Sequence, residues 1–206
     1  MSSLYFEIFD KPRIDAFRKL SVFKARGILA GGTAVALQLG HRYSYDFDVF
    51  TSKKIPKKLL GEIVDVFGDK IEKLVDQTTE LSFLTPGKVK VSFIQFPFPL
   101  LHPVVKTKSL SLFNLKDLAS NKAYTIGRRG EYRDYVDMFF LLKSGLSLKK
   151  IIKESKERFF GAFSERLFLE QLVYFDDLED KKVDLLKDNF TSEEILEFFQ
   201  NKVRNY

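Results

Sequence analysis

The sequence predicts an α+β (α/β) fold, in which a mixed sheet with its helices is followed by a helical C-terminal part. The main observation is a single change of pattern along the 206 residues. Up to about Pro99, short helical stretches alternate with short β-like runs, and from about Leu112 nearly every stretch has a helical period. No internal repeat or Gly/Ser linker appears. We therefore expect residues 1–110 to form the sheet-containing core and residues 111–206 to form a helical region packed on it.

The elements of the first part follow from the spacing of apolar residues. A three-to-four spacing from Ile14 to Phe23 predicts an amphipathic helix, and the apolar run 27–31 predicts a short buried strand. The remaining expected elements are a helix over 33–39, a strand over 45–50, a helix over 56–67, and strands over 78–84 and 88–96 joined by a hairpin loop at 85–87.

The second part is expected to be helical throughout. Apolar residues between 115 and 126 form one helix face, and those between 135 and 140 form another. Three more helices are expected over 148–157, 164–174 and 192–203, the last opened by Thr191 or Ser192 with Glu194 in a capping arrangement.

Composition limits the possible sites and locations. The chain has no cysteine, and its two histidines lack an HExxH spacing, so a zinc site is not indicated and any metal must be held by oxygen. No apolar run is long enough to cross a membrane, and the N-terminus lacks the apolar segment of a signal peptide. We therefore expect a cytoplasmic protein with no membrane partner.

The net charge of +6 suits a polyanionic partner, but the excess is spread along the chain. The densest basic bias runs from Val104 to Arg133. Two interpretations stay open for this stretch. A solvated face is the commoner case, and a surface that attracts phosphate groups is the functional one.

A double glycine stands between the first expected strand and the helix after it. Gly31 and Gly32 allow the backbone to turn sharply and to approach a ligand closely, while the N–H groups of a helix that begins near Thr33 suit a phosphate. The alternative is an ordinary tight turn with Thr33 as the helix N-cap.

Asp46 and Asp48 are two residues apart on an expected strand. Both carboxylates therefore project from one face, separated by about 6.6 Å of strand rise. Such a pair can converge on a hard cation, and magnesium binds one or two protein carboxylates together with nucleotide phosphates. An exposed strand edge is the alternative, but Phe47 indicates that the opposite face is buried.

The order of these motifs resembles the nucleotidyltransferase superfamily, whose signature is Gly-Gly or Gly-Ser followed at this distance by Asp-x-Asp. The more specific resemblance is to the AbiEii/AbiGii toxin family of nucleotidyltransferase-like proteins. It depends on four segments that together span most of the chain: Gly31-Gly32-Thr33-Ala34, Arg42-x-Ser44-x-Asp46-Phe47-Asp48, Leu115 to Ala119 leading through Lys122 to Arg129 and Arg133-Asp134-x-x-Asp137, and Tyr174-Phe175-Asp176-Asp177.

The resemblance implies transfer of a nucleoside monophosphate from a nucleoside triphosphate on a nucleotidyltransferase fold. Asp46 and Asp48 would hold magnesium, or manganese in its place, and would be catalytic together with Asp134. The residues expected to bind the nucleotide are Gly31, Gly32, Thr33, Arg42, Ser44 and Lys122.

Structural roles remain open for several of these residues. Lys122 falls on an apolar helix face, where a lysine at the edge of a core extends its ammonium to solvent. Asp134 lies near a helix N-terminus, where the dipole stabilises a carboxylate, and Asp137 is spaced to pair with Arg133.

Arg42 and Ser44 either order the loop before the aspartates or contact phosphate. His41 carries no signal. Asp176 and Asp177 match the family pattern but are expected as helix caps.

One departure from the superfamily concerns a third carboxylate on a later strand, for which Ser92 is the expected position. Either a second metal is bound weakly, or Glu80 on the neighbouring strand substitutes, or transfer activity has been lost.

The leading hypothesis is a magnesium-dependent nucleotidyltransferase of the AbiEii toxin type that acts on RNA, tRNA among the candidates, or on protein. The alternatives are a catalytically degenerate nucleotide- or RNA-binding module on the same fold and a structural partner of a cognate antitoxin.

Overall fold

The computed structural model describes residues 4–178, 182–186 and 189–206. Its single sheet has the strand order β1-β2-β5-β4-β3, in which β2 and β5 are parallel and every other neighbouring pair is antiparallel. The predicted mixed sheet is therefore confirmed. The strands are β1 (Ile28–Leu29), β2 (Phe47–Thr51), β3 (Glu72–Asp76), β4 (Glu80–Leu84) and β5 (Lys90–Gln95).

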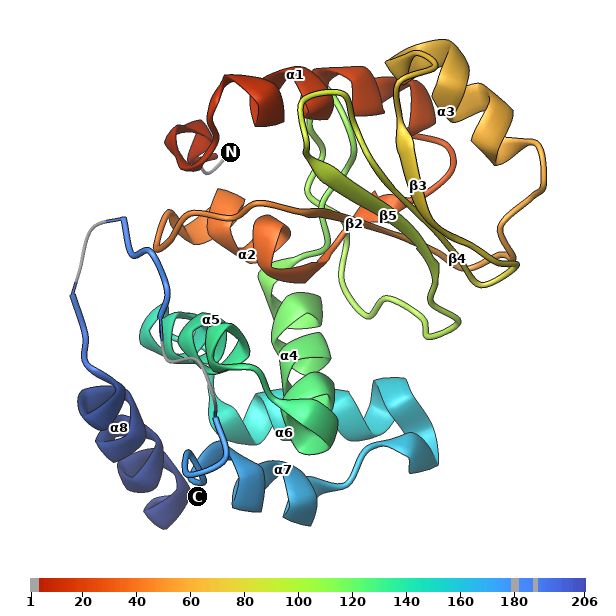
Figure 1. Cartoon of the computed structure of the whole chain (residues 1–206). Coiled ribbons are helices and arrows are strands. Elements are labelled where there is room, and N and C mark those ends of the chain that lie inside the picture. The colour runs from red at the N-terminus through yellow and green to blue at the C-terminus, as the bar shows by residue number, and fades with distance from the viewer. Residues whose placement is uncertain (1–3, 179–181, 187–188) are drawn as a thin grey trace.

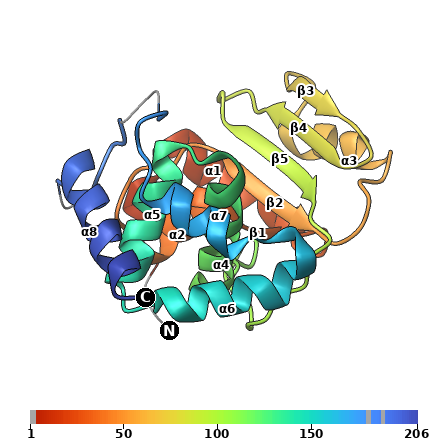
Figure 2. The ribbon, with the colours of Figure 1, turned by 90° about the horizontal axis from the view of Figure 1, so that it is seen from below.

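Helices cover the sheet and form most of the second half of the chain. In the view of Figure 1, α1 and α3 lie above the sheet, and α4 to α7 lie below it, with α2 in between. Figure 2 shows β3, β4 and α3 projecting away from this helical group. The helices are α1 (Lys11–Lys19), α2 (Gly31–Leu39), α3 (Leu59–Phe67), α4 (Leu115–Arg129), α5 (Tyr132–Lys143), α6 (Leu148–Phe159), α7 (Glu165–Leu172) and α8 (Ser192–Arg204), with short 3-10 turns at Phe6–Ile8, Leu20–Phe23 and Phe160–Ala162.

Strand alternation gives the sheet one apolar and one polar face. Phe47 on β2 and Phe93 on β5 are buried, and they contact Phe17 of α1 and Phe23 just after it, with ring centroids 6.0 and 5.4 Å apart. Successive strand residues point to opposite faces, so Asp48, next to Phe47, projects to the other side. The aromatic packing of α1 thus fixes which face of β2 remains open for chemistry.

The helical part is organised around α4. This helix contacts α5, α6 and α7, and α2 contacts both α4 and α5. One hydrophobic core contains residues from both predicted parts of the chain. The expected capping box at Thr191 and Glu194 is confirmed at the start of α8.

Three local expectations differ from the structure. Strand β3 was not expected, because Glu72, Lys73 and Asp76 are charged and exposed on a sheet edge and give no apolar alternation. Helix α2 begins at Gly31 instead of Thr33, with Ala30 as its N-cap. Asp46 lies just before β2, so it is a loop residue.

Candidate active site

A cavity of about 630 Å³ lies between the polar face of the sheet and the helices α4 and α5. Its walls come from α2, β2, β4, β5, α4 and α5, and from residues 182–184. The structure brings together all the residues that the sequence singled out for catalysis, nucleotide binding or metal binding. They are Asp46, Asp48, Asp134, Gly31, Gly32, Thr33, Arg42, Ser44 and Lys122.

The two glycines are required by close contacts at the start of α2. Gly31 has a φ of +64°, and a Cβ there would overlap the carboxylate of Asp48. A Cβ on Gly32 would overlap the guanidinium of Arg42. In the described part of the chain, the N–H groups of Gly31, Gly32 and Thr33 have no acceptor, and Ala30 provides no side-chain cap. The turn therefore offers free N–H donors to an anion.

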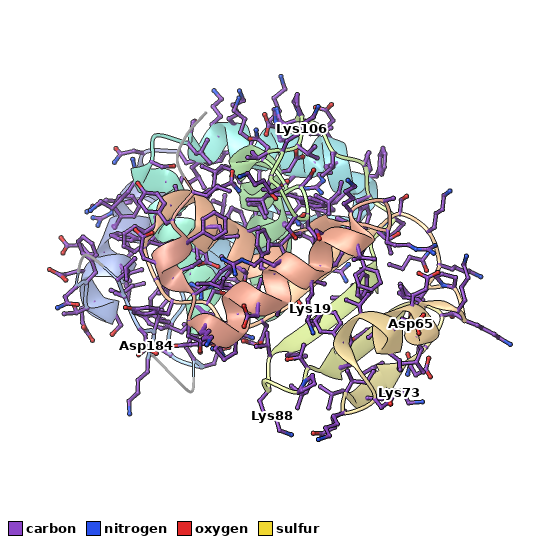
Figure 3. The ribbon with its side chains drawn as sticks, turned by 90° about the horizontal axis from the view of Figure 1, so that it is seen from above. Lys19, Asp65, Lys73, Lys88, Lys106 and Asp184 are labelled. Atoms are coloured by element: carbon purple, nitrogen blue, oxygen red, sulfur yellow. The ribbon has the colours of Figure 1, made fainter. Side chains whose placement is uncertain are left out.

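Thr33 is not an N-cap but a link to the loop before β2. Its hydroxyl donates to the carbonyl oxygen of Asp46, and the hydroxyl of Ser44, 2.7 Å away, donates to it. On the outer side of the loop, the Tyr43 N–H donates to the carbonyl oxygen of Asp184 at 2.9 Å. Asp184 lies near one end of α1 in Figure 3, at the outside of the molecule. These bonds fix the loop that carries Asp46.

Asp46 and Asp48 are half-buried neighbours that share one wall of the cavity. Burial and the charge of Asp46 raise the pKa of Asp48. Neither carboxylate has an ion-pair partner among the described residues. Two unpaired carboxylates near each other form a donor set that suits a hard divalent cation. Over the described chain, no group of three acidic or histidine side chains is close enough together to hold a metal.

Ser92 lies beside Asp48 on the neighbouring strand, where β2 and β5 pair in parallel. Its hydroxyl is 2.8 Å from the hydroxyl of Ser82, which donates to the Glu80 carboxylate at 2.6 Å. Glu80 also lines the cavity, but it does not complete a cluster of three acids with Asp46 and Asp48. Hydroxyl groups therefore occupy the wall where a third carboxylate was expected.

A buried ionic cluster lies behind the glycine turn, with Asp137 at its centre. Arg42 donates to both oxygens of Asp137, from Nε to Oδ1 at 2.6 Å and from Nη2 to Oδ2 at 3.0 Å. The Nζ of Lys122 is 2.6 Å from Asp137 Oδ2, and Nε2 of His41 is 2.8 Å from Oδ1. The Asp137 side chain is 0% exposed. The ring of His41, for which the sequence gives no signal, thus completes this cluster.

Burial and the neighbouring charges shift the pKa values of the cluster in opposite directions. Burial alone would raise the pKa of Asp137, but the Arg42 and Lys122 cations hold it well below its usual value. Burial alone would lower the pKa of Lys122, yet the carboxylates of Asp134 and Asp137 raise it. For His41, burial dominates and lowers the pKa. Pairing with cations thus keeps the buried Asp137 charged, whereas burial keeps the His41 imidazole neutral at neutral pH.

Lys122 is shared between Asp137 and Asp134, whose Oδ1 accepts from Nζ at 2.7 Å. Asp134 also accepts from the N–H of Glu131, in a capping box at the start of α5. Two carboxylates thus take two of the three ammonium protons and leave one for a ligand in the cavity. The predicted pair between Asp137 and Arg133 is wrong, because Asp137 faces inward and Arg133 pairs with Glu131 at 2.7 Å.

The other family-pattern acids and most of the basic stretch lie outside the cavity. Asp176 and Asp177 are exposed in a turn after α7 and cap none of the helices in the described residues, so the expectation that they are caps is wrong. From the basic stretch, Lys122 and Arg133 line the cavity, whereas Lys106 does not. Figure 3 shows Lys106 well away from the cavity residue Asp184.

The part of the chain that the structure describes contains no helix long and apolar enough to cross a membrane.

A family model described as "Nucleotidyl transferase AbiEii toxin, Type IV TA system" matches residues 16–204. An uncharacterized protein of Aquifex aeolicus (strain VF5) is 35% identical over 184 residues, which are 86% of each chain.

Two solved structures share the fold. JHP933 from Helicobacter pylori superposes with a TM-score of 0.57 at 18% identity, covering 98% of this chain and 94% of its own. MenT4, a nucleotidyltransferase toxin from Mycobacterium tuberculosis H37Rv, superposes with a TM-score of 0.58 at 13% identity, covering 94% and 82%. The predicted nucleotidyltransferase fold is therefore confirmed, and the extent of the family match shows that the chain belongs to the AbiEii family of nucleotidyl transferase toxins.

Proposed function

We propose that this chain transfers a nucleoside monophosphate from a magnesium-bound nucleoside triphosphate to an acceptor. The observation that carries the proposal is the convergence of all nine candidate residues on one cavity. The acceptor is RNA, tRNA among the candidates, or a protein hydroxyl. The toxin family also supports a cognate antitoxin as a partner.

Asp46 and Asp48 would hold the divalent cation. Their carboxylates have no ion-pair partner in the described chain, and burial together with the negative charge of Asp46 raises the pKa of Asp48. A bound cation would offset their negative charge and would supply charge neutralisation for the transferred phosphoryl group. Manganese would serve in the same oxygen-ligand site.

The chain's own donors would bind and orient the triphosphate. The free N–H groups of Gly31, Gly32 and Thr33 suit its phosphate oxygens, and the remaining ammonium proton of Lys122 would stabilise the charge that develops in the transition state. Asp134 already accepts two hydrogen bonds, which favours its role as the group that orients Lys122 over a role as general base.

For Arg42 and Ser44, the contacts support the loop-ordering role. Arg42 is committed to Asp137 through two hydrogen bonds, and the Ser44 hydroxyl to Thr33. Both still line the cavity, so a phosphate contact by either would add to these bonds.

One observation favours a second candidate function. Ser92 and Ser82 provide hydroxyls beside Asp48, and no third acid joins the metal pair in the described residues. On this view the cavity binds a nucleotide or RNA and does not turn it over.

The deciding experiment uses purified protein, magnesium, each α-labelled nucleoside triphosphate in turn, and total RNA. Asp46→Ala/Asp48→Ala should abolish transfer, whereas the matched pair Asp176→Ala/Asp177→Ala, outside the cavity, should keep it. Label on RNA or protein from the wild type and the matched control establishes the transferase. Binding of triphosphate without transfer, lost only in the first variant, establishes the binding module.

A further inference from the structure

The cavity face of the two parallel strands changes from charged to apolar along its length. The register pairs Asp48 with Ser92 and, two residues on, Phe50 with Ile94. Phe96 follows on β5's side of the cavity, and its ring stacks on Phe50 with centroids 4.5 Å apart. Two residues of strand rise about 6.6 Å, so the aromatic pair begins within one nucleoside length of the metal aspartates.

Helix α4 also contributes to the wall of the cavity. Asn121, Tyr124 and Thr125 are spaced i, i+3 and i+4, so they share one helix face, and all three line the cavity. The Tyr124 ring is held by stacking on Phe159, with centroids 4.4 Å apart, and the Thr125 hydroxyl donates to the carbonyl oxygen of Asn121.

The side chain of Asn121 is unexplained by the protein itself. Both its Nδ2 and its Oδ1 are buried, and neither has a hydrogen-bond partner in the described chain. A buried amide without partners is costly and uncommon, because each polar atom has lost its water. An unpartnered donor and acceptor in a cavity that also contains a stacked aromatic pair have the chemistry that a nucleobase edge requires.

We propose that the apolar end of the cavity holds the nucleobase of the triphosphate and that Asn121 is the residue that selects the base. This inference rests on the proposed function. Phe50 and Phe96 provide the aromatic surface against which the base packs, and the Asn121 carboxamide hydrogen-bonds a neighbouring donor and acceptor on its edge. The triphosphate then extends toward Gly31, Gly32 and the metal pair.

The test measures, by isothermal titration calorimetry with magnesium, the binding of ATP, CTP, GTP, UTP and inorganic tripolyphosphate to the full chain. Asn121→Leu removes both hydrogen-bonding atoms at nearly equal volume and also removes two unpartnered polar atoms, so the variant should keep the wild-type melting temperature. Asn121→Asp keeps an acceptor and loses the donor. Asn201 is exposed on α8, so Asn201→Asp is the matched control for Asn121→Asp.

We expect the wild type to bind one nucleotide more tightly than the others. Asn121→Leu should lower the affinity for that nucleotide by about 10- to 100-fold and leave the affinity for tripolyphosphate unchanged. Asn121→Asp should change the order of preference, and Asn201→Asp should not. The inference is overturned if Asn121→Leu keeps the wild-type preference, or if the wild type binds all four nucleotides and tripolyphosphate alike. In that last case the phosphate site of the proposed function still stands. A wild type that binds neither tripolyphosphate nor any nucleotide overturns both proposals.

Discussion

Replacement of Asp137 by asparagine should remove a large share of the stability of this protein. The carboxylate is fully buried and lies against two cations, Arg42 and Lys122, at 2.6 Å each, and against Nε2 of His41 at 2.8 Å. Asparagine keeps the volume but removes the charge, so among the described residues Arg42 loses its ion-pair partner and Lys122 keeps Asp134. Breaking a buried ion pair by removing one partner costs about 3–5 kcal/mol.

For a chain of this length, that loss corresponds to a fall in melting temperature of roughly 6–20 °C, since each kcal/mol shifts it by about 2–4 °C. Urea unfolding followed by circular dichroism measures the free energy, and Asp177→Asn provides an exposed control that should change it by less than about 0.5 kcal/mol. If the free energy of unfolding of Asp137→Asn is within about 1 kcal/mol of the wild type, with an unchanged m-value, the reasoning is refuted, because the smallest loss expected for a buried pair is about 3 kcal/mol.

The same variant has a defined pH signature. The folded pKa of Asp137 is depressed well below its ordinary value of 3.8, so its stabilisation is present above that value and is lost as pH falls through the lower, folded pKa. The difference between wild type and Asp137→Asn should therefore be constant from about pH 5 to 8 and shrink only below about pH 4. A difference that already shrinks near neutral pH would contradict the assignment.

Three further changes test other contacts. Gly32→Ala should lower both the melting temperature and the triphosphate affinity, because the new Cβ displaces Arg42. As a control, Gly61→Ala should stabilise α3 by up to about 1 kcal/mol, because a Cβ at Gly61 meets nothing within 4 Å. Equal effects of the two substitutions would contradict the close contact at Gly32. The pKa of His41 is lowered in the folded protein, so as pH falls the unfolded chain takes up this proton at a higher pH than the folded chain, and the free energy of unfolding should fall below about pH 6.5. His41→Gln should reduce the slope of the free energy of unfolding against pH between about pH 7.5 and 5.5. An unchanged slope would exclude a neutral buried imidazole. Ser92→Asp should have a lower melting temperature than the wild type in EDTA and a larger increase on addition of magnesium. An equal increase would contradict a magnesium site beside Ser92 at Asp46 and Asp48.

Local patterns were sufficient to predict the central strands and the glycine turn. Phe47 between two aspartates predicted a buried face opposite an acidic one, and the structure has this arrangement, with Asp46 just outside the strand. The hairpin loop at 85–87 and the capping box at Thr191 also depend only on neighbouring residues, and both were predicted. Strand β3 could not be predicted, because its residues are mostly exposed and show no apolar alternation. It forms through its backbone pairing with β4.

The ionic cluster was beyond local reasoning for a different reason. An acid four residues after Arg133 is satisfied equally well by a surface pair or by a distant partner, and only the contact between α2, α4 and α5 decides that Asp137 faces inward. One signal was available: Asp137 interrupts the apolar run of α5, as Lys122 does on α4. Two opposite charges on apolar faces of neighbouring helices indicate a buried pair, and weighing them together would have found it. Asn121 gives no such signal, since its burial depends on the cavity walls.

The cluster also explains why the cavity needs both parts of the chain. Arg42 comes from the loop before β2, whereas Lys122 and Asp137 come from α4 and α5, so the charges of each part are balanced by the other. Within residues 1–110, Arg42 would lack the Asp137 carboxylate. The balanced cluster lies behind the turn, and in the described residues it leaves the two aspartates of β2 and its preceding loop without an ion-pair partner. The fold thus separates charges that hold the two parts together from charges that remain available to a cation.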